Sequence, residues 1–169
     1  MMTYSEALNF LKENKCSKEV IAHCILVSKK SYEIAKKIQD KGFSIDLELA
    51  RVGGLLHDVG RSKIHNIFHG IEGAKILKEH PLLARIAKTH IGGGITKEEA
   101  EKLGLPIEDY SPITIEEKVV CYADKLVQGD TFTTDASEEI KKLENKLGIN
   151  HPSIERLKVI ENEIKKIIG

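Results

Sequence analysis

One stretch of the sequence restricts the fold more than any other, namely residues 51–61, Arg-Val-Gly-Gly-Leu-Leu-His-Asp-Val-Gly-Arg. Its apolar and small residues are typical of a buried helix, yet this helix would run directly into His57 and Asp58. Burying an imidazole beside a carboxylate is costly unless each group is hydrogen-bonded, paired or bound to a cation. A helix cap or a local hydrogen bond would satisfy the pair, and so would a metal ion. Gly60 is expected to end the helix as a C′ glycine, with Arg61 just beyond it.

Apolar residues recur at helical spacing along most of the chain. Ser17 and Thr96 are suited to capping helix N-termini, and Pro81 suits a first turn. The predicted helices are Ser5 to about Asn14, Lys18 to about Lys41, Leu47 to about Val59, one that begins at His69, one from Pro81 that ends before His90, Lys97 to about Leu103, Glu116 to about Gln128, Asp135 to about Leu147 and Ser153 to about Ile168. We find no alternating strand of useful length, so the predicted fold class is all-α, a helical bundle.

Two segments between these helices lack a clean period. Residues 61–68 are expected to form a loop across the site, and the glycines at 92–94 to form a flexible tether. The tether lacks the Gly-Lys-Ser/Thr ending and the preceding strand of a phosphate-binding P-loop, which we therefore reject. We expect a single domain over residues 1–169, with its core at about 17–130 and two C-terminal helices at about 135–168 that close its outside.

Composition excludes several classes of function. Lys+Arg and Asp+Glu both number 26, and a net charge of zero argues against a general nucleic-acid or membrane-surface binder. Cys16, Cys24 and Cys121 are odd in number and form no C-x-x-C, so we expect neither a disulfide framework nor a zinc knuckle. The N-terminal residues do not resemble a signal peptide. We therefore expect a soluble, cytoplasmic protein with reduced thiols.

Two further polar residues lie in apolar surroundings. His23 sits one turn into the helix from Lys18, next to its apolar stripe, and Asp124 follows Tyr122 and Ala123 in a helix with an apolar face. A lone histidine in such a place is more often a satisfied core residue than a ligand. Together with His57 and Asp58, however, these residues could form a mixed imidazole and carboxylate site, which without thiolates suits Mn, Fe, Co, Ni or Zn better than structural zinc.

The order of these residues resembles the HD-domain phosphohydrolases. The matching elements are His23, then His57-Asp58 with Gly60 behind it, then Asp124, and the likeness covers about residues 17–130. The resemblance implies a helical bundle around a metal site, with His23, His57, Asp58 and Asp124 binding one ion.

Two more histidines match the subgroup of this family that holds two metals. His69 before Gly70 and His90 at the end of the next helix resemble the ligands of the second ion, with Asp58 bridging both. Helix capping by His69 and a favourable interaction of His90 with a helix dipole are the alternatives. The implied cofactor is a divalent transition metal in two copies, with Fe²⁺ favoured and Mn²⁺, Co²⁺, Ni²⁺ or Zn²⁺ as alternatives.

The implied chemistry is phosphate-ester hydrolysis by attack of a metal-activated hydroxide. Asp58, Arg61, His65 and Lys125 are the predicted catalytic residues. Arg61, Lys125 and, less favoured, Lys63 could contact phosphate oxygens, and each could equally be a solvated surface charge. His65 could line the pocket or protonate a leaving alkoxide.

The resemblance also restricts the substrate, which we expect to be a small phosphorylated molecule. Lys88-Thr89-His90-Ile91-Gly92-Gly93 lacks the second adjacent histidine and the Gly-Tyr-Pro element of the branch that degrades cyclic dinucleotides. Size and motif order are closer to small stand-alone archaeal members, among them iron-dependent phosphodiesterases that open 7,8-dihydroneopterin 2′,3′-cyclic phosphate in methanopterin biosynthesis. The alternatives are a phosphohydrolase of dinucleoside polyphosphates or nucleoside monophosphates, and a non-catalytic nucleotide or metal sensor. The sequence does not indicate the oligomeric state.

Overall fold

The computed structural model describes all residues, 1–169, and confirms the predicted all-α fold as a single domain. The elements are α1 (Tyr4–Glu13), α2 (Lys18–Asp40), α3 (Leu47–Leu56), the 3-10 turn η1 (Val59–Ser62), α4 (His69–Ile76), α5 (Pro81–Thr89), α6 (Lys97–Leu103), α7 (Ile115–Lys125), β1 (Val127–Gln128), β2 (Thr131–Phe132), α8 (Ser137–Leu147) and α9 (Pro152–Ile168). No helix is both long enough and apolar enough to cross a bilayer.

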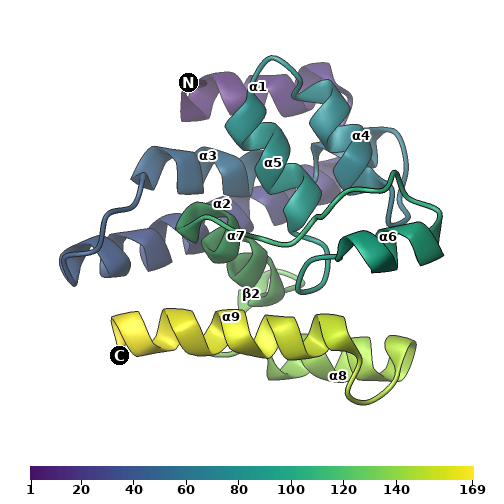
Figure 1. Cartoon of the computed structure of the whole chain (residues 1–169). Coiled ribbons are helices and arrows are strands. Elements are labelled where there is room, and N and C mark those ends of the chain that lie inside the picture. Colours follow the sequence, from purple (N-terminus) through teal and green to yellow (C-terminus); the bar gives the residue numbers. More distant parts are fainter.

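The centre of the bundle is formed by α2, α3, α5 and α7. Helix α3 packs along α2, and α7 contacts α2, α3 and α5, while α4 and α5 form a helical hairpin (Figure 1). Leu55, Leu56, Ile38 and Ile86 are fully buried between these helices. The ends of α3, α5 and α7 therefore meet inside the protein, where their terminal residues can form a shared site.

Local sequence explains where most helices begin. Ser17, Thr96 and Thr114 each accept a hydrogen bond from the backbone N–H three residues later, and Pro81 opens α5 as predicted. Helix α7 ends earlier than predicted, at Lys125, because residues 127–128 pair with residues 131–132 in a small antiparallel hairpin. We expected no strand, and this two-stranded hairpin corrects that expectation.

Gly60 does not have the role that we predicted for it. Helix α3 ends at Leu56, and Gly60 lies within η1 without a positive φ angle. A Cβ atom at Gly60 would lie 1.8 Å from the carbonyl oxygen of His69 and 2.5 Å from the backbone nitrogen of Gly73. Glycine is needed here because η1 and the first turn of α4 pack backbone against backbone.

The glycines at 92–94 are not a free tether either. The N–H of Gly93 donates to Oγ of Ser153 at 3.0 Å, and Arg156 donates to the carbonyl oxygen of Gly94 at 2.8 Å. A Cβ at Gly93 would lie 2.2 Å from the carbonyl oxygen of Ser153. This segment is thus packed against α9, so our expectation of a flexible connection is wrong.

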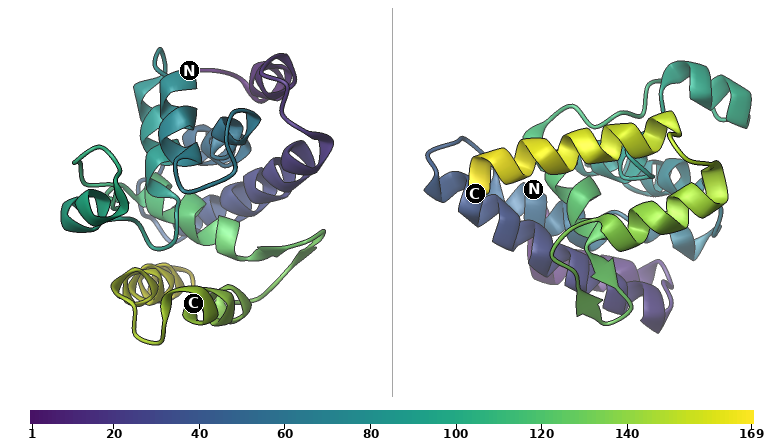
Figure 2. Two further views of the ribbon diagram at one scale, coloured as in Figure 1. Left: turned by 90° about the vertical axis from the view of Figure 1, so that its right-hand side faces the viewer. Right: turned by 90° about the horizontal axis from the view of Figure 1, so that it is seen from below.

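The two C-terminal helices lie side by side on one side of the bundle (Figure 2). Helix α9 buries Ile154, Leu157, Ile160 and Ile164, whereas α8 contains no buried residue. Leu157, Ile160 and Ile164 belong to the same apolar cluster as the residues of α2, α3 and α7. Helix α9 is therefore part of the core, and α8 covers its outside.

We expect Leu157→Ala to destabilise the protein by about 2–4 kcal/mol, because Leu157 is fully buried and its removal leaves a cavity. Val159→Ala, two residues along the same helix, is the control. Val159 is 54% exposed, so its truncation should change the free energy of unfolding by less than about 0.5 kcal/mol. Urea denaturation measures both, and equal effects would show that α9 is not part of the cooperative core.

Candidate metal centre

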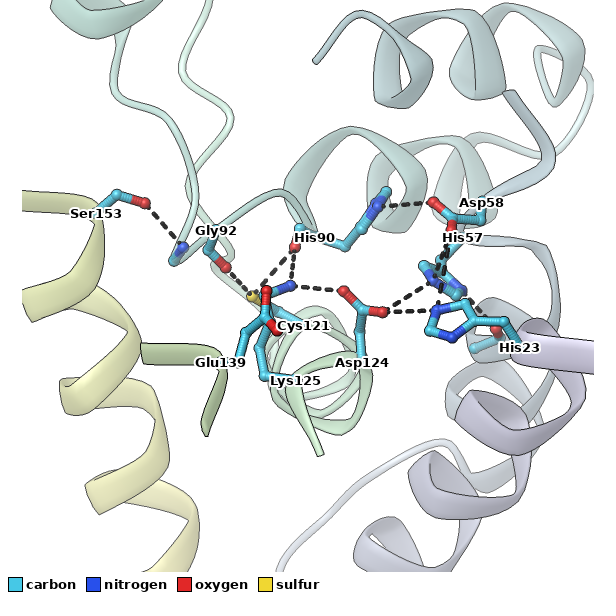
Figure 3. A network of polar contacts seen from close by, with 12 residues as sticks. His23, His57, Asp58, His90, Gly92, Cys121, Asp124, Lys125, Glu139 and Ser153 are labelled. Atoms are coloured by element: carbon cyan, nitrogen blue, oxygen red, sulfur yellow. Dashed lines mark hydrogen bonds and ion pairs between the residues drawn. The ribbon is translucent and has the colours of Figure 1, made fainter. Parts of the chain in front are cut away.

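Five elements bring together all six residues that were predicted as metal ligands. They are His23 in α2, His57 and Asp58 directly after α3, His69 at the start of α4, His90 directly after α5 and Asp124 near the end of α7. Their ligand atoms form three overlapping triplets, within each of which all atoms lie within 4.8 Å of one another. Most of these side chains point toward one another in Figure 3, and His57 is completely buried.

Asp58 lies between two groups of histidines. Its Oδ1 is 3.0 Å from Nε2 of His69 and 3.2 Å from Nε2 of His90. Its Oδ2 is 3.6 Å from Nε2 of His57 and 3.9 Å from Nε2 of His23. The two oxygens of one carboxylate thus face different pairs of imidazoles.

Asp124 completes the group around His23 and His57. Its Oδ1 is 2.9 Å from Nε2 of His23 and 3.4 Å from Nε2 of His57. Asp124 and Asp58 therefore approach this pair of histidines with one oxygen each. The side chains of His23 and Asp124 are 29% and 17% exposed, so this group borders the solvent.

The orientation of three histidines is fixed by the main chain. In each, Nδ1 donates to the carbonyl oxygen of the residue three positions earlier: His57 to Gly54 at 2.7 Å, His69 to Asn66 at 2.6 Å and His90 to Ala87 at 2.8 Å. A carbonyl oxygen can only accept, so Nδ1 carries a proton in each of the three rings, and whenever a ring is neutral its Nε2 presents a lone pair to the cluster. Metal-binding histidines are commonly oriented in this way.

The cluster has the properties of a cation site. Nε2 of His69 and Nε2 of His90 lie 3.0 Å apart, so two lone pairs face each other when both rings are neutral. Nε2 of His57 and Oδ1 of Asp58 are buried without a hydrogen-bond partner. Buried lone pairs and carboxylates at these distances require a positive charge between them. Imidazole and carboxylate donors without a thiolate suit a divalent transition metal.

The pKa shifts within the cluster are consistent with a site for a divalent cation. Burial lowers the pKa of His90 to about 4, so this ring is neutral near pH 7. Burial alone would raise the pKa of Asp58, yet the charge of the neighbouring His57 and the close approach of His69 and His90 hold that pKa well below its usual range. Burial likewise opposes ionisation of Asp124, but the charge of Lys125 outweighs it and lowers the pKa of Asp124. Burial lowers the pKa of His57, but the Asp58 and Asp124 carboxylates outweigh it and raise that pKa well above its usual range. The cluster thus contains two carboxylates, a protonated His57 whose proton a bound cation would replace, and the neutral ring of His90.

The remaining predicted catalytic residues differ in position. Nε of Arg61 donates to Oδ2 of Asp58 at 2.8 Å, and its guanidinium group also donates to the carbonyl oxygen of His65 at 3.3 Å. The side chain of Arg61 is 31% exposed, so it borders the cluster and the solvent. The side chains of His65 and Lys63 are exposed, and neither forms a hydrogen bond with the cluster.

Lys125 is not placed as we expected for a phosphate-binding residue. It is buried, and its Nζ donates to Oδ2 of Asp124 at 2.7 Å and to the carbonyl oxygen of His90 at 2.8 Å. Burial lowers the pKa of a lysine, but the adjacent Asp124 carboxylate outweighs it and raises the pKa of Lys125. The ammonium group is therefore charged and engaged within the protein.

An all-α bundle with buried histidines and aspartates converging on one point defines a class of metal-binding helical domain. The model of the HD domain matches residues 20–129, and the chain belongs to this family. This match covers the segments that supply all six residues of the cluster.

Three relatives show how this domain occurs in other proteins. The chain is 51% identical over 170 residues to an uncharacterized protein of Methanocaldococcus jannaschii, with 99% of both chains covered. It is 40% identical over 167 residues to a tRNA (cytidine(56)-2′-O)-methyltransferase of Picrophilus torridus and 40% identical over 126 residues to the enzyme of the same name from Thermoplasma volcanium. The chain covers 47% and 36% of these two methyltransferases, so it spans about half or less of their length.

Solved structures share the fold at low sequence identity. The HD domain of the phosphodiesterase PgpH from L. monocytogenes, in complex with cyclic-di-AMP, has a TM-score of 0.57 with 19% identity, covering 94% of this chain and 92% of that one. A second structure of the same domain has a TM-score of 0.53, also with 19% identity, and coverage of 96% and 99%. These similarities establish the HD-domain architecture.

Proposed function

We propose that this protein is a metal-dependent phosphohydrolase that cleaves a phosphodiester in a small cyclic phosphate. The observation that carries the proposal is the position of Asp58, whose two oxygens face two separate pairs of histidines. A carboxylate in this position can bridge two cations. Membership of the HD family and the fold shared with the PgpH phosphodiesterase domain support the reaction class.

The ligands would divide into two sets that share Asp58. His23, His57 and Asp124 would hold one ion through Nε2 and carboxylate oxygens, and His69 and His90 the other. We favour Fe²⁺, and Mn²⁺, Co²⁺, Ni²⁺ or Zn²⁺ would suit the same donors. Two such ions, when bound, activate water near neutral pH and stabilise the charge that develops on a phosphoryl group.

The protein itself would orient the substrate. Arg61 is held by Asp58 and by the main chain at His65, and its remaining N–H groups are free to donate to phosphoryl oxygens. His65 follows on the same exposed loop and is our proposed donor of a proton to the leaving alkoxide. The burial of His57, His69 and His90 keeps their ligand atoms in place.

Our proposed substrate is 7,8-dihydroneopterin 2′,3′-cyclic phosphate, supported by the sequence resemblance alone. A second candidate is favoured by the two tRNA methyltransferase relatives, which contain this domain within a longer chain. In that case the substrate would be a nucleotide or an RNA-derived phosphodiester, such as a nucleoside 2′,3′-cyclic phosphate. The pterin and the nucleoside 2′,3′-cyclic phosphates contain the same strained five-membered phosphodiester ring.

Metal removal followed by reloading tests the proposal. We expect chelated protein to be inactive and to melt at a lower temperature, because an ion that binds only the folded state stabilises it. Anaerobic addition of Fe²⁺ or Mn²⁺ should restore both properties. The assay compares the pterin cyclic phosphate, a nucleoside 2′,3′-cyclic phosphate, a monoester and a dinucleoside polyphosphate. Cleavage of the monoester alone would contradict the cyclic-phosphate proposal, and bound ions without any hydrolysis would favour a sensor.

A further inference from the structure

Lys125 is a buried charge that the proposed reaction does not use. It is the last residue of α7, and its side chain is only 6% exposed. A buried ammonium group is tolerated only when it is paired and hydrogen-bonded. The partners of Lys125 therefore indicate what its charge is for.

Those partners belong to different halves of the metal centre. One is Oδ2 of Asp124, whose other oxygen faces His23 and His57. The second is the carbonyl oxygen of His90, whose ring faces Asp58 and His69 on the other side of the cluster. One ammonium group thus contacts the side chain of one ligand and the main chain of another (Figure 3).

The contact with Asp124 fixes the orientation of a ligand. Because Lys125 holds Oδ2 at 2.7 Å, the carboxylate cannot rotate freely, and Oδ1 remains directed at His23 and His57. Without this donor, Oδ2 would be free to compete for the same histidines. The ammonium also offsets part of the negative charge of Asp124.

The contact with His90 fixes the main chain at the end of α5. The thiol of Cys121, one turn earlier in α7, lies 3.7 Å from the same carbonyl oxygen and 3.3 Å from that of Gly92. Ser153 of α9 holds the next residue, Gly93, at 3.0 Å. The segment after His90 is thus fixed by α7 and α9, and Lys125 provides its charged contact.

We propose that Lys125 is a positioning residue. It holds Asp124 and His90 in fixed positions relative to one another, and so couples the two halves of the metal centre. The inference rests on the proposed two-ion function. It assigns Lys125 no contact with the substrate, because its ammonium group faces the protein. Lysine provides three donors on a flexible stem, and the planar guanidinium group of arginine would not reproduce this geometry.

The test compares Lys125→Met with wild-type protein in Mn²⁺ titrations without substrate. Methionine keeps most of the length of the unbranched side chain, lacks the ammonium group and so removes both hydrogen bonds. We expect Mn²⁺ affinity to fall by about 10–100-fold, as for other residues that support metal ligands. With saturating Mn²⁺ we expect kcat to fall and KM to stay unchanged. The spin-coupled electron paramagnetic resonance signal of a two-Mn²⁺ centre should weaken.

Lys118→Met is the matched control, since Lys118 lies two turns earlier in α7 and pairs only with Glu163, at 2.6 Å. It should bind Mn²⁺ as wild-type protein does. If Lys125→Met does not fold, Lys125→Arg serves in its place, and we expect it to fold and to bind Mn²⁺ at least about tenfold more weakly.

Unchanged Mn²⁺ affinity together with a raised KM would overturn the inference, because that result indicates a substrate contact. Lower stability of the metal-free protein with unchanged Mn²⁺ affinity would overturn it as well. Wild-type protein that binds both ions but hydrolyses no phosphate ester would contradict the proposed function and leave the effect of Lys125 on Mn²⁺ affinity measurable. Wild-type protein that binds a single ion would overturn both.

Discussion

Asp58→Asn should remove both bound metal and hydrolytic activity while the protein stays folded. Asparagine has nearly the same shape as aspartate but lacks its charge, and its amide nitrogen cannot act as a ligand. Because Asp58 approaches both pairs of histidines, its loss affects both proposed ions. We expect kcat/KM to fall at least about 1,000-fold, which corresponds to a loss of about 4 kcal/mol of transition-state stabilisation.

Elemental analysis, steady-state kinetics and circular dichroism together check this prediction. Asp40→Asn is the control, since Asp40 is 59% exposed at the end of α2 and pairs only with Lys36. It should leave metal content and kcat unchanged. A metal-loaded and active Asp58→Asn protein would contradict the bridging role of Asp58.

Among glycine-to-alanine substitutions in this protein, we expect Gly60→Ala to cause the largest loss of stability. The new Cβ would lie 1.8 Å from the carbonyl oxygen of His69, which belongs to packed backbone rather than to a flexible side chain. The start of α4 must therefore move, which costs about 3 kcal/mol or more. His69 would move away from Asp58, so the occupancy of the second proposed ion should fall.

Gly73→Ala, on the α4 side of the same contact, provides a graded comparison. Its new Cβ would approach no atom closer than 3.3 Å, and the gain in helix propensity offsets part of this crowding. We expect a change within about 1 kcal/mol in its free energy of unfolding and normal metal content. Urea denaturation and Mn²⁺ stoichiometry measure both variants. Equal stability of Gly60→Ala and wild-type protein would show that η1 and α4 do not pack as described.

The sequence was sufficient to predict the fold class and most helix positions, because these depend on local signals. Capping residues such as Ser17 and Thr96 and the first-turn Pro81 act within one turn of the chain. The six residues of the cluster were also predictable, because polar side chains stood out within apolar helices. Their roles as ligands remain predictions.

The features that we misjudged depend on contacts between distant segments. Gly60 resembles a helix C-cap in sequence, but its role follows from the close approach of α4. The glycines around Gly93 resemble a flexible linker until α9 is placed against them. Lys125 follows a proposed ligand in sequence and so suggested a phosphate contact, whereas its actual partners include a carbonyl group 35 residues away. No local pattern contains this information.

The main-chain acceptors at Gly54, Asn66 and Ala87 affect how such a site could change during evolution. A backbone carbonyl group is present whatever side chain its residue carries, so the tautomers of three imidazoles do not depend on the identity of neighbouring residues. Surrounding positions could therefore diverge among descendants without altering the donor atoms offered to an ion. Diversification toward new substrates would then require changes at the rim of the site and none in its ligand chemistry.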